Sequence, residues 1–306
     1  MDADTFTDAR IIAIAENFIP VKVNPEDKER PENLEAQQKY GIRGFPAILF
    51  ISPDGGVIKN HSGYMPPNDF LPVMENVLKT ESEFQEKLAE YKEKPDDVKL
   101  NREIAILFLQ RQQVEKALPI SKKMPDDVEL NREFGFYYLG KDQIDEALQI
   151  SEKMPDDVKL NNQIAVTYLQ KRQIEAALPY SKKVIEKDPK NSSGLLPNLH
   201  IQIGLAYAMK LQVEAGKEGT DVSELAENAI MYFQTIIDKY PKSTNYETAQ
   251  YYLGITYSLN KQYDKSIALF EKLISHSSDD RIIQSATRQL ERVKGLAAEA
   301  GETSDN

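Results

Sequence analysis

The sequence predicts a mainly α-helical protein, in which a partial α/β domain over residues 1–78 is followed by an α-solenoid over residues 95–299. Residues 1–78 contain short apolar, β-branched runs bounded by turn residues, which are typical of strands. From there on the tetrad Pro-Asp-Asp-Val recurs every 30 residues, at Pro95, Pro125 and Pro155. A fixed period in this range indicates stacked helical hairpins, each too small to bury its own apolar face.

The first region is expected to alternate strands and helices. The predicted strands are Phe18–Val23 and Ala47–Ile51, and the predicted helices are Leu34–Tyr40 and Asn68–Leu78. The second strand is followed by Asp54-Gly-Gly56 and then by the apolar pair Val57-Ile58. Asp-Gly between two apolar runs predicts a hairpin, because a tight turn needs residues that adopt positive φ.

A linking helix over residues 79–94 is expected between the two regions. Thr80-Glu-Ser-Glu83 fits a capping box, which satisfies backbone donors at the start of a helix. Phe84, Leu88 and Tyr91 then fall on one helical face. This helix is in register with the second helix of a repeat, so it could form the first half-hairpin of the array.

The three 30-residue units align without a gap over residues 100–124, 130–154 and 160–184. Identical residues recur at equivalent positions: Asn101, Asn131 and Asn161; Ala117, Ala147 and Ala177; and Ser121, Ser151 and Ser181. Farther along, Asp280–Ala298 predicts a polar helix that closes the array. Residues 300–306 are expected to be a disordered tail.

The repeated aspartate pairs are Asp96-Asp97, Asp126-Asp127 and Asp156-Asp157. Each pair follows a proline and precedes a helix, where a carboxylate accepts backbone N–H groups and meets the positive end of the helix dipole. A calcium loop would need several oxygen ligands within about 12 residues and a glycine at its sharp turn. We therefore interpret the pairs as helix caps.

Composition excludes several classes of function. The chain has no cysteine, so thiolate metal sites, disulfides and cysteine nucleophiles are ruled out for these residues. Its formal net charge of −11 disfavours a nucleic-acid partner. The histidines His61, His200 and His276 lack the i, i+4 spacing of a helical metal site, and no phosphate-binding motif is present. We expect no cofactor, no metal, no catalytic residue and no membrane insertion.

Residues 1–78 resemble a thioredoxin-like domain. The resemblance is carried by Tyr40-Gly-Ile-Arg-Gly-Phe-Pro-Ala-Ile-Leu-Phe50, then by Pro53-Asp-Gly55 and by Gly63. It implies that the Phe45–Pro46 peptide bond is cis and that its loop contacts bound polypeptides. Thr5-Phe6 is similar to the residues that follow Trp-Cys-x-x-Cys in members of this family. The redox cysteines and the central first strand of that fold are missing from this sequence.

The repeats resemble tetratricopeptide repeats, which are helix–turn–helix units of about 34 residues. The clearest unit carries Leu253-Gly254, Tyr257, Tyr263, Ser266 and Phe270. Ala105, Gly135 and Ala165 occupy the position of Gly254 in the three shorter units, whose 30-residue period predicts a shortened turn between repeats. An insertion that contains Gly216-Lys-Glu-Gly219 predicts lengthened helices and a protruding loop in the unit of Gly204.

This second resemblance implies a concave groove lined by the first helix of each repeat. The expected protein-binding residues are Arg102, Ile106, Arg132, Phe136, Asn162, Val166 and Tyr251. Members of the family that clamp a peptide carboxylate have Lys and Asn at the positions of Arg102 and Ile106, so that clamp is absent here. Two arginines in a partly apolar groove favour a peptide segment with some acidic character. An alternative is that Ile106, Phe136 and Val166 only pack between repeats.

The sequence thus predicts a non-catalytic adaptor or chaperone-like scaffold that binds a protein or peptide partner. Thioredoxin-like domains joined to such repeats resemble bacterial folding-assistance proteins. The alternative is the C-terminal fragment of a thiol-disulfide oxidoreductase whose Cys-x-x-Cys lies upstream of Met1. The adaptor as written would be cytoplasmic, and a longer native protein would be periplasmic or extracytoplasmic. The sequence leaves the partner and the oligomeric state open.

Overall fold

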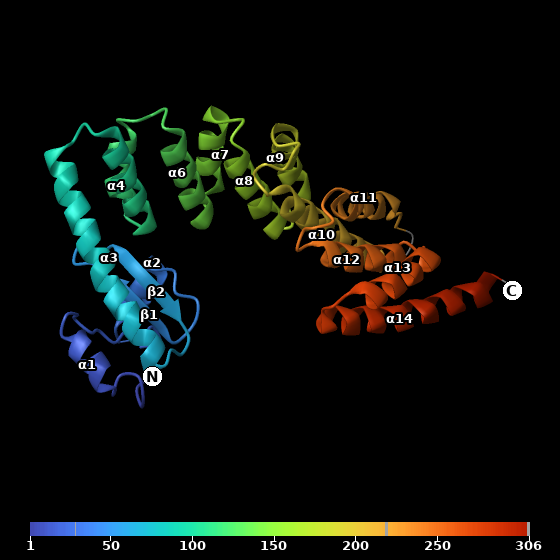
Figure 1. Cartoon of the computed structure of the whole chain (residues 1–306), viewed down its shortest axis with the longest axis horizontal. Coiled ribbons are helices and arrows are strands. Elements are labelled where there is room, and N and C mark those ends of the chain that lie inside the picture. The colour runs from blue at the N-terminus through green and yellow to red at the C-terminus, as the bar shows by residue number, and fades with distance from the viewer. Residues whose placement is uncertain (28, 218–219, 305–306) are drawn as a thin grey trace. The chain divides into compact units, whose positions relative to one another are not determined.

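The structure is a computed structural model that describes residues 1–27, 29–217 and 220–304 (Figure 1). The chain divides into two compact units, Met1–Tyr137 and Tyr138–Asn306. The first unit contains the α/β region together with the beginning of the repeat array, and the second contains the remaining repeats. The domain boundaries expected near residues 78, 94 and 299 stay predictions.

Unit 1 is built from three helices and a hairpin, followed by the first repeat. Its elements are α1 (Ala9–Ala15), α2 (Pro31–Lys39), β1 (Ala47–Ile51), β2 (Val57–Ser62), α3 (Pro67–Glu93), α4 (Val98–Gln110), α5 (Val114–Ser121) and most of α6 (Val128–Gly140). Unit 2 begins at the end of α6. It continues with α7 (Ile144–Lys153), α8 (Val158–Gln170), α9 (Ile174–Lys187), α10 (Leu196–Glu214), α11 (Ser223–Lys239), α12 (Tyr246–Leu259), α13 (Tyr263–His276) and α14 (Asp280–Ser304).

The predicted hairpin is confirmed. Strands β1 and β2 pair antiparallel, with Ala47 opposite Ser62 and Phe50 opposite Lys59. Gly55 has a φ of +86°, which the turn between the strands requires and which a residue with a Cβ adopts only at a cost. Helix α3 packs against the sheet (Figure 1).

The predicted strand at Phe18–Val23 is wrong. Residues 19–23 belong to no strand, and no described residue forms a backbone hydrogen bond with them. Ile19 is 91% exposed and Val21 is 76% exposed. Apolar, β-branched residues form a strand only when a neighbouring strand satisfies their backbone groups, and none of the described residues supplies one here. Phe18, by contrast, packs on Phe50 with ring centroids 5.5 Å apart.

Helix α3 runs without interruption from Pro67 to Glu93, where the sequence predicted two successive helices. No glycine or proline separates residues 78 and 80, and the residues of the expected capping box continue the helix. Phe70, Met74 and Val77 are buried against the hairpin, and Phe84 is buried farther along the same helix. One helix therefore serves both the α/β core and the start of the repeats.

The turns between the 30-residue units have one geometry, which confirms the capping interpretation for the second aspartate of each pair. The second aspartate of each pair accepts the N–H three residues later, at 3.0 Å for Asp97, 2.9 Å for Asp127 and 2.8 Å for Asp157. The side-chain amide that follows donates to the carbonyl of the repeat's own proline, at 2.9 Å for Asn101, 2.8 Å for Asn131 and 3.0 Å for Asn161. Each turn is thus held at both ends by side chains.

The shorter period arises in the second helix of the first two units, which corrects the expectation of a shortened turn. Helices α5 and α7 have 8 and 10 residues, whereas α9 and α13 have 14 each. The residue before a proline avoids helical dihedral angles, so Pro125 and Pro155 end the preceding helices early. Helix α9 has Ile185 where this proline would recur, and it continues to Lys187.

Both kinds of repeat share the turn between their two helices. Each turn contains a residue with positive φ: Gln112 at 60°, Asp142 at 63°, Arg172 at 60° and Lys261 at 56°. The residue that follows is always glutamine, and its N–H donates to a carbonyl in the first helix over 2.8–2.9 Å. A left-handed residue that closes a helix in this way satisfies carbonyls that would otherwise lack a partner.

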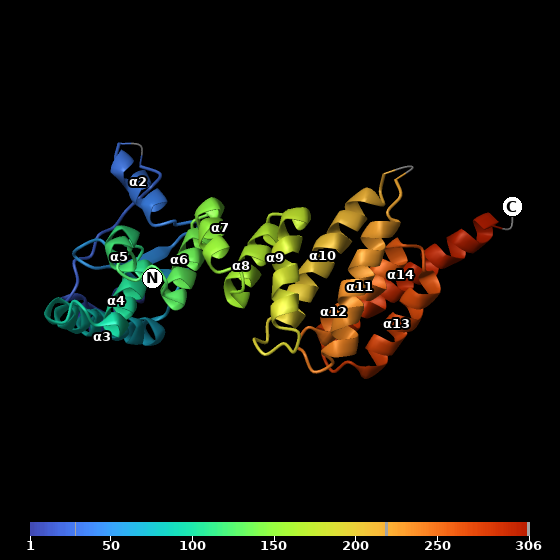
Figure 2. The ribbon, with the colours of Figure 1, turned by 90° about the horizontal axis from the view of Figure 1, so that it is seen from above.

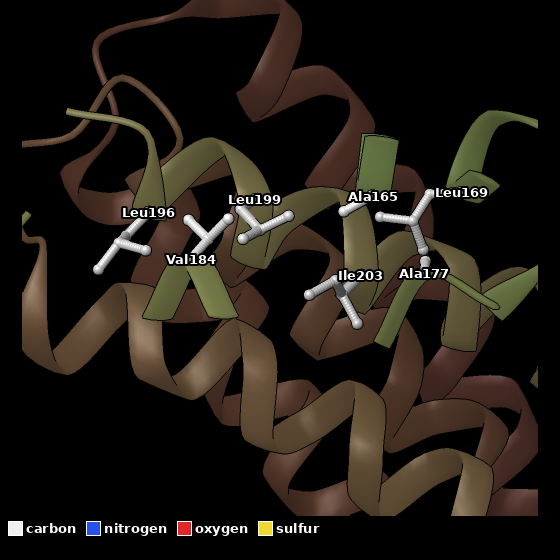
Figure 3. Close-up of a cluster of buried hydrophobic side chains, with 7 residues drawn as sticks. All are labelled: Ala165, Leu169, Ala177, Val184, Leu196, Leu199 and Ile203. Carbon is white, nitrogen blue, oxygen red and sulfur yellow. The ribbon is translucent and has the colours of Figure 1, made fainter. Parts of the chain in front are cut away.

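Buried side chains from successive helices form continuous layers in unit 2. Figure 3 shows one layer, in which α8 contributes Ala165 and Leu169, α9 contributes Ala177 and Val184, and α10 contributes Leu196, Leu199 and Ile203. Helices α10 and α11 are the lengthened pair that the insertion predicts, with 19 and 17 residues. The expected loop at Gly216–Gly219 falls partly outside the described residues, as 218–219 are not described.

The closing helix extends beyond its predicted end. Helix α14 covers Asp280–Ser304 instead of ending at Ala298, and it buries Ala286 and Val293 against α13. The expected disordered tail at residues 300–306 therefore begins within a helix. Residues 305–306 lie outside the described part of the chain.

Candidate protein-binding surfaces

A hollow of about 660 Å³ lies in unit 1 between the first turns of α4 and α6. It is lined by Val98 and Arg102 on one side and by Val128, Glu129 and Arg132 on the other. The structure thus brings together two of the predicted groove residues, Arg102 and Arg132. Val98 and Val128 are both more than half exposed at its rim. The hollow combines apolar and charged side chains, which suits a polypeptide better than a small apolar molecule.

Arg102 is held by two carboxylates of the next repeat. Its Nε and Nη2 atoms lie 2.7 Å and 2.6 Å from Asp127 Oδ2, and its Nη1 atom lies 3.3 Å from Glu129 Oε2. Burial opposes ionisation of Asp127, but hydrogen bonds from Arg102 and from the Leu130 N–H outweigh it and lower the pKa of Asp127. The charge of Arg102 is therefore largely neutralised within the protein, which weakens the argument for an acidic partner.

The other predicted groove residues differ in exposure. Ile106 and Phe136, in unit 1, are half-buried and retain accessible surface. In unit 2, Asn162 is only 8% exposed and Val166 only 9% exposed, so both pack within the helix layers. Tyr251 is half-buried against neighbouring rings. Ile106 and Phe136 are therefore the predicted apolar groove residues that a ligand can reach. The hollow lined by Arg102 and Arg132 is accessible as well.

The loop that the resemblance assigned to polypeptide contact is exposed in unit 1. The Phe45–Pro46 peptide bond is cis, as expected, and the Gly63 N–H donates to the Pro46 carbonyl over 2.8 Å. Phe45 itself is 61% exposed. An aromatic side chain held out into solvent from an anchored loop is available for contact with a partner.

Exposed apolar side chains are concentrated near this loop in sequence, which sequence reasoning missed. Nine of the fourteen large apolar residues that are exposed in the described chain fall in its first 64 residues: Phe6, Ile12, Ile19, Val21, Val23, Leu34, Phe45, Ile51 and Tyr64. Helix α2 buries none of its side chains and stands apart from α3–α5 in Figure 2.

Strand β1 also has an unpaired edge. Gly63 N–H bonds the Pro46 carbonyl, and hydrogen-bonded pairs alternate along an antiparallel ladder. The backbone groups of Ala47, Leu49 and Ile51 therefore face away from β2, and no described residue pairs with them. Such an edge can accept a further extended strand.

The β1–β2 turn is docked on the first repeat. The Val57 N–H donates to the Arg111 carbonyl over 2.9 Å, and Gln113 Nε2 donates to the Asp54 carbonyl over 3.2 Å. Lys116 Nζ lies 2.5 Å from Asp54 Oδ2. Burial of Asp54 opposes its ionisation, but hydrogen bonds from Lys116, Ser52 and Gln113 hold its pKa well below the ordinary value.

Arg111 completes this attachment from inside the unit. It is only 4% exposed, its Nη1 atom lies 2.6 Å from Glu81 Oε2, and its guanidinium stacks 3.7 Å above the ring of Phe84. Residues of α3 and of the α4–α5 turn are thereby joined. Sequence reasoning had no signal for this contact, since Glu81 and Arg111 are 30 residues apart and belong to no motif.

Comparisons with known proteins agree with this division of the chain. Residues 1–78 match the family model of the thioredoxin-like domain, and residues 202–243 and 248–279 match that of the tetratricopeptide repeat. A comparison with curated proteins gave no match. In the described residues, no helix is long and apolar enough to cross a membrane, and no three potential ligands are grouped to hold a metal ion. The chain joins a thioredoxin-like domain at its N-terminal end to tetratricopeptide repeats.

Proposed function

We propose that this protein is a non-catalytic adaptor or chaperone-like scaffold that binds a polypeptide in the groove of its repeats. The proposal is carried by the hollow between α4 and α6, which has Arg102 and Arg132 in its lining. Tetratricopeptide repeats, which the chain contains, point to a role in protein interaction. Ile106 and Phe136 would supply the apolar contacts of this groove.

The buried groove candidates would stabilise the helices of the repeats and would not contact the partner. Asn162 and Val166 lie within the packing of α8, and Tyr251 packs on Tyr252 and Phe270 with ring centroids 5.3 Å and 6.0 Å apart. These three residues would shape the array that presents the groove. Direct contact with the partner would then fall to Ile106, Arg132 and Phe136, and to Phe45 at the cis-proline loop.

Docking of the hairpin on the first repeat supports a joint role for the two regions. Asp54 and Val57 bond residues of the α4–α5 turn, so the thioredoxin-like domain and the first repeat form one compact unit. A polypeptide held by α4 and α6 would be presented to a domain whose position is fixed. Such a role needs no redox chemistry and is therefore compatible with a chain that contains no cysteine.

The test is suppression of aggregation by the full chain, with a chemically denatured model enzyme as client and no thiol present. We expect the wild-type protein to reduce light scattering, and Phe136→Ala to weaken this effect several-fold while circular dichroism shows an unchanged fold. Tyr91→Ala is the matched control, because Tyr91 is a half-buried aromatic residue of α3, like Phe136 in exposure but outside the proposed groove. Equal activity of the wild-type protein and of Phe136→Ala would refute the groove assignment.

A second candidate, part of a thiol-disulfide oxidoreductase, is favoured by one observation. The unpaired edge of β1 and the exposed residues Ile19 and Val21 offer a place for a further strand next to the cis-proline loop. Mass spectrometry of the endogenous protein tests this candidate. A species heavier than 34.8 kDa by several kilodaltons, with two cysteines alkylated after reduction, would support the oxidoreductase. A species of 34.8 kDa would exclude it and leave the adaptor.

A further inference from the structure

A second hollow, of about 320 Å³, lies in unit 2 where α9, α10 and α11 meet. Its apolar walls include Ile185 of α9 and Leu196 of α10, and Met231 of α11 is half exposed at its edge. We call this hollow the His200 pocket, after the one histidine in its lining. It is distinct from the groove of the first repeats, with which it shares no residue.

Stacked rings form one side of the His200 pocket. The imidazole of His200 lies 5.6 Å from the ring of Tyr232 and 6.1 Å from that of Tyr240, measured between centroids. Tyr207 extends the stack, with its ring nearly parallel to Tyr232 at 6.1 Å. Flat aromatic surfaces beside a hollow favour occupation by another ring or by a large apolar side chain.

His200 is a polar side chain without a partner in this apolar setting. It is only 6% exposed, and its Nδ1 atom has no hydrogen-bond partner among the described residues. Burial, assisted by the charge of Lys239, lowers the pKa of His200 to about 4. The imidazole is therefore neutral near pH 7. The neutral imidazole contributes a flat aromatic face to the lining of the pocket.

The charges at the pocket are unbalanced. Lys239 is exposed and is the one charged residue in the lining, and its ammonium forms no ion pair with any described residue. Asp188, whose charge acts on Tyr240, already accepts the Ser192 and Ser193 N–H groups at 2.6 Å and 2.8 Å. In a chain with a net charge of −11, an apolar pocket with a single unpaired cation is complementary to an anionic ligand.

We propose that the His200 pocket binds an aromatic side chain of a partner polypeptide that carries a carboxylate at the next position. The ring enters against Tyr232, His200 and Tyr240, and the carboxylate pairs with Lys239. Met231 closes over the bound ring, as the flexible methionine side chain adapts to different contacts. This site goes beyond the proposed groove, because it uses other helices and another kind of recognition.

The test follows the methionine methyl groups of the full chain by NMR as blocked peptides are added. Each probe is a Gly/Ser decapeptide with a central Phe-Glu pair, and its matched controls replace this pair by Phe-Gln or Ala-Glu. Among the signals of the seven methionines, that of Met231 is assigned through Met231→Leu. We expect the Phe-Glu peptide to shift the Met231 methyl and to leave Met209 unmoved, which is equally exposed on α10.

Variants at the rim of the His200 pocket distinguish the contribution of the charge to binding from that of the apolar contact. Lys239→Gln should weaken binding of the Phe-Glu peptide about tenfold and leave the weaker binding of Phe-Gln unchanged. Lys242→Gln is the matched control, as a nearby lysine outside the pocket, and should bind like the wild type. Met231→Glu should abolish binding, whereas Met209→Glu should not. Both methionines are exposed, so both variants are expected to fold.

Several outcomes would overturn the proposal. These are an unmoved Met231 methyl at millimolar peptide, equal binding of the Phe-Glu and Phe-Gln peptides, and a shift of Met231 that depends on protein concentration without peptide. The last would identify a second copy of the chain as the occupant. The aggregation assay with Phe136→Ala is independent of these readouts, so failure of the groove proposal is distinguishable from failure of this one.

Discussion

The repeats before and after residue 190 solve the same packing problem with different residues. In the later repeats a glycine in the first helix meets a ring in the second: a Cβ added at Gly254 would lie 2.7 Å from the ring of Phe270. Gly254 and Phe270 are sixteen positions apart, and Ala165 and Ser181 have the same spacing in an earlier repeat. There both residues are small and buried. The two helices can thus cross over a ring set on a glycine or over two small side chains.

This difference is reflected in the comparison with known families. The tetratricopeptide model matches residues 202–243 and 248–279, where Gly204 and Gly254 are the glycines that face a ring. The 30-residue repeats keep the same helix order and the same left-handed turn, but they lack the ring, and the first two have shorter second helices. The same backbone arrangement can therefore form around different packing residues.

The largest effect is expected from removal of a ring that sits on a glycine. Phe270→Ala should lower the free energy of unfolding by about 3–5 kcal/mol, because the fully buried ring leaves a cavity that Gly254 cannot fill. Ser181→Ala, at the equivalent position of an earlier repeat, should cost less than about 1 kcal/mol, because its hydroxyl bonds only the Ala177 carbonyl of its own helix. Urea unfolding followed by circular dichroism measures both. Equal losses would contradict the contrast.

The next largest loss of stability is expected when the glycine of the same contact is replaced. Gly254→Ala should destabilise the protein by about 1–3 kcal/mol, since the new methyl group would press on the Phe270 ring. Gly140→Ala is the control, because nothing lies within 4 Å of a Cβ added there. The control should be neutral or slightly stabilising in the same urea titration. A neutral Gly254→Ala would show that the ring moves aside at little cost.

The aspartate caps distinguish the two neighbours in each acidic pair. Asp157→Ala should cost about 1 kcal/mol, because its carboxylate caps α8 at the Leu160 N–H. Asp156→Ala should cost only a few tenths, as its ion pair with Lys187 is solvent-exposed. Thermal unfolding of both variants at one pH provides the comparison. A larger loss for Asp156→Ala would reject the capping assignment.

The smallest effect is expected at the turn that both kinds of repeat share. Lys261→Gly should raise the free energy of unfolding by about 0.5–1 kcal/mol, because glycine adopts the positive φ of 56° without a steric penalty. Gln112→Gly should have a similar effect in the first repeat, where φ is 60°. Differential scanning calorimetry can resolve such changes. Opposite signs for the two variants would show that the turns are less alike than their backbones indicate.

Local signals predicted the features that depend on neighbouring residues. The hairpin at Asp54-Gly-Gly56, the aspartate caps and the lengthened α10–α11 pair all follow from sequence spacing and turn chemistry. The strand expected at Phe18–Val23 failed because strand formation depends on a neighbour distant in sequence. The early end of α5 and α7 was missed because the proline effect was assigned to the turn and not to the helix before it.

The candidate sites were predictable to different degrees. Arg102 and Arg132 were found because the resemblance to tetratricopeptide repeats places the first helix of each repeat along a groove, and the structure brings both residues to one hollow. The engagement of Arg102 by Asp127 was missed, because side-chain pairing between repeats has no periodic signature of its own. The His200 pocket was missed for a similar reason: its rings come from α10 and α11, which the insertion separates in sequence.

Attachment of the β1–β2 turn to the first repeat has a mechanical consequence. Gly56 leaves no room for a Cβ, which would lie 2.9 Å from the Gln113 side chain, so the turn and the repeat are in close contact. Strand β1 connects this turn directly to the loop at Phe45. A displacement of the α4–α5 corner would therefore carry strand β1 and the loop at Phe45 with it, because all three belong to one compact unit.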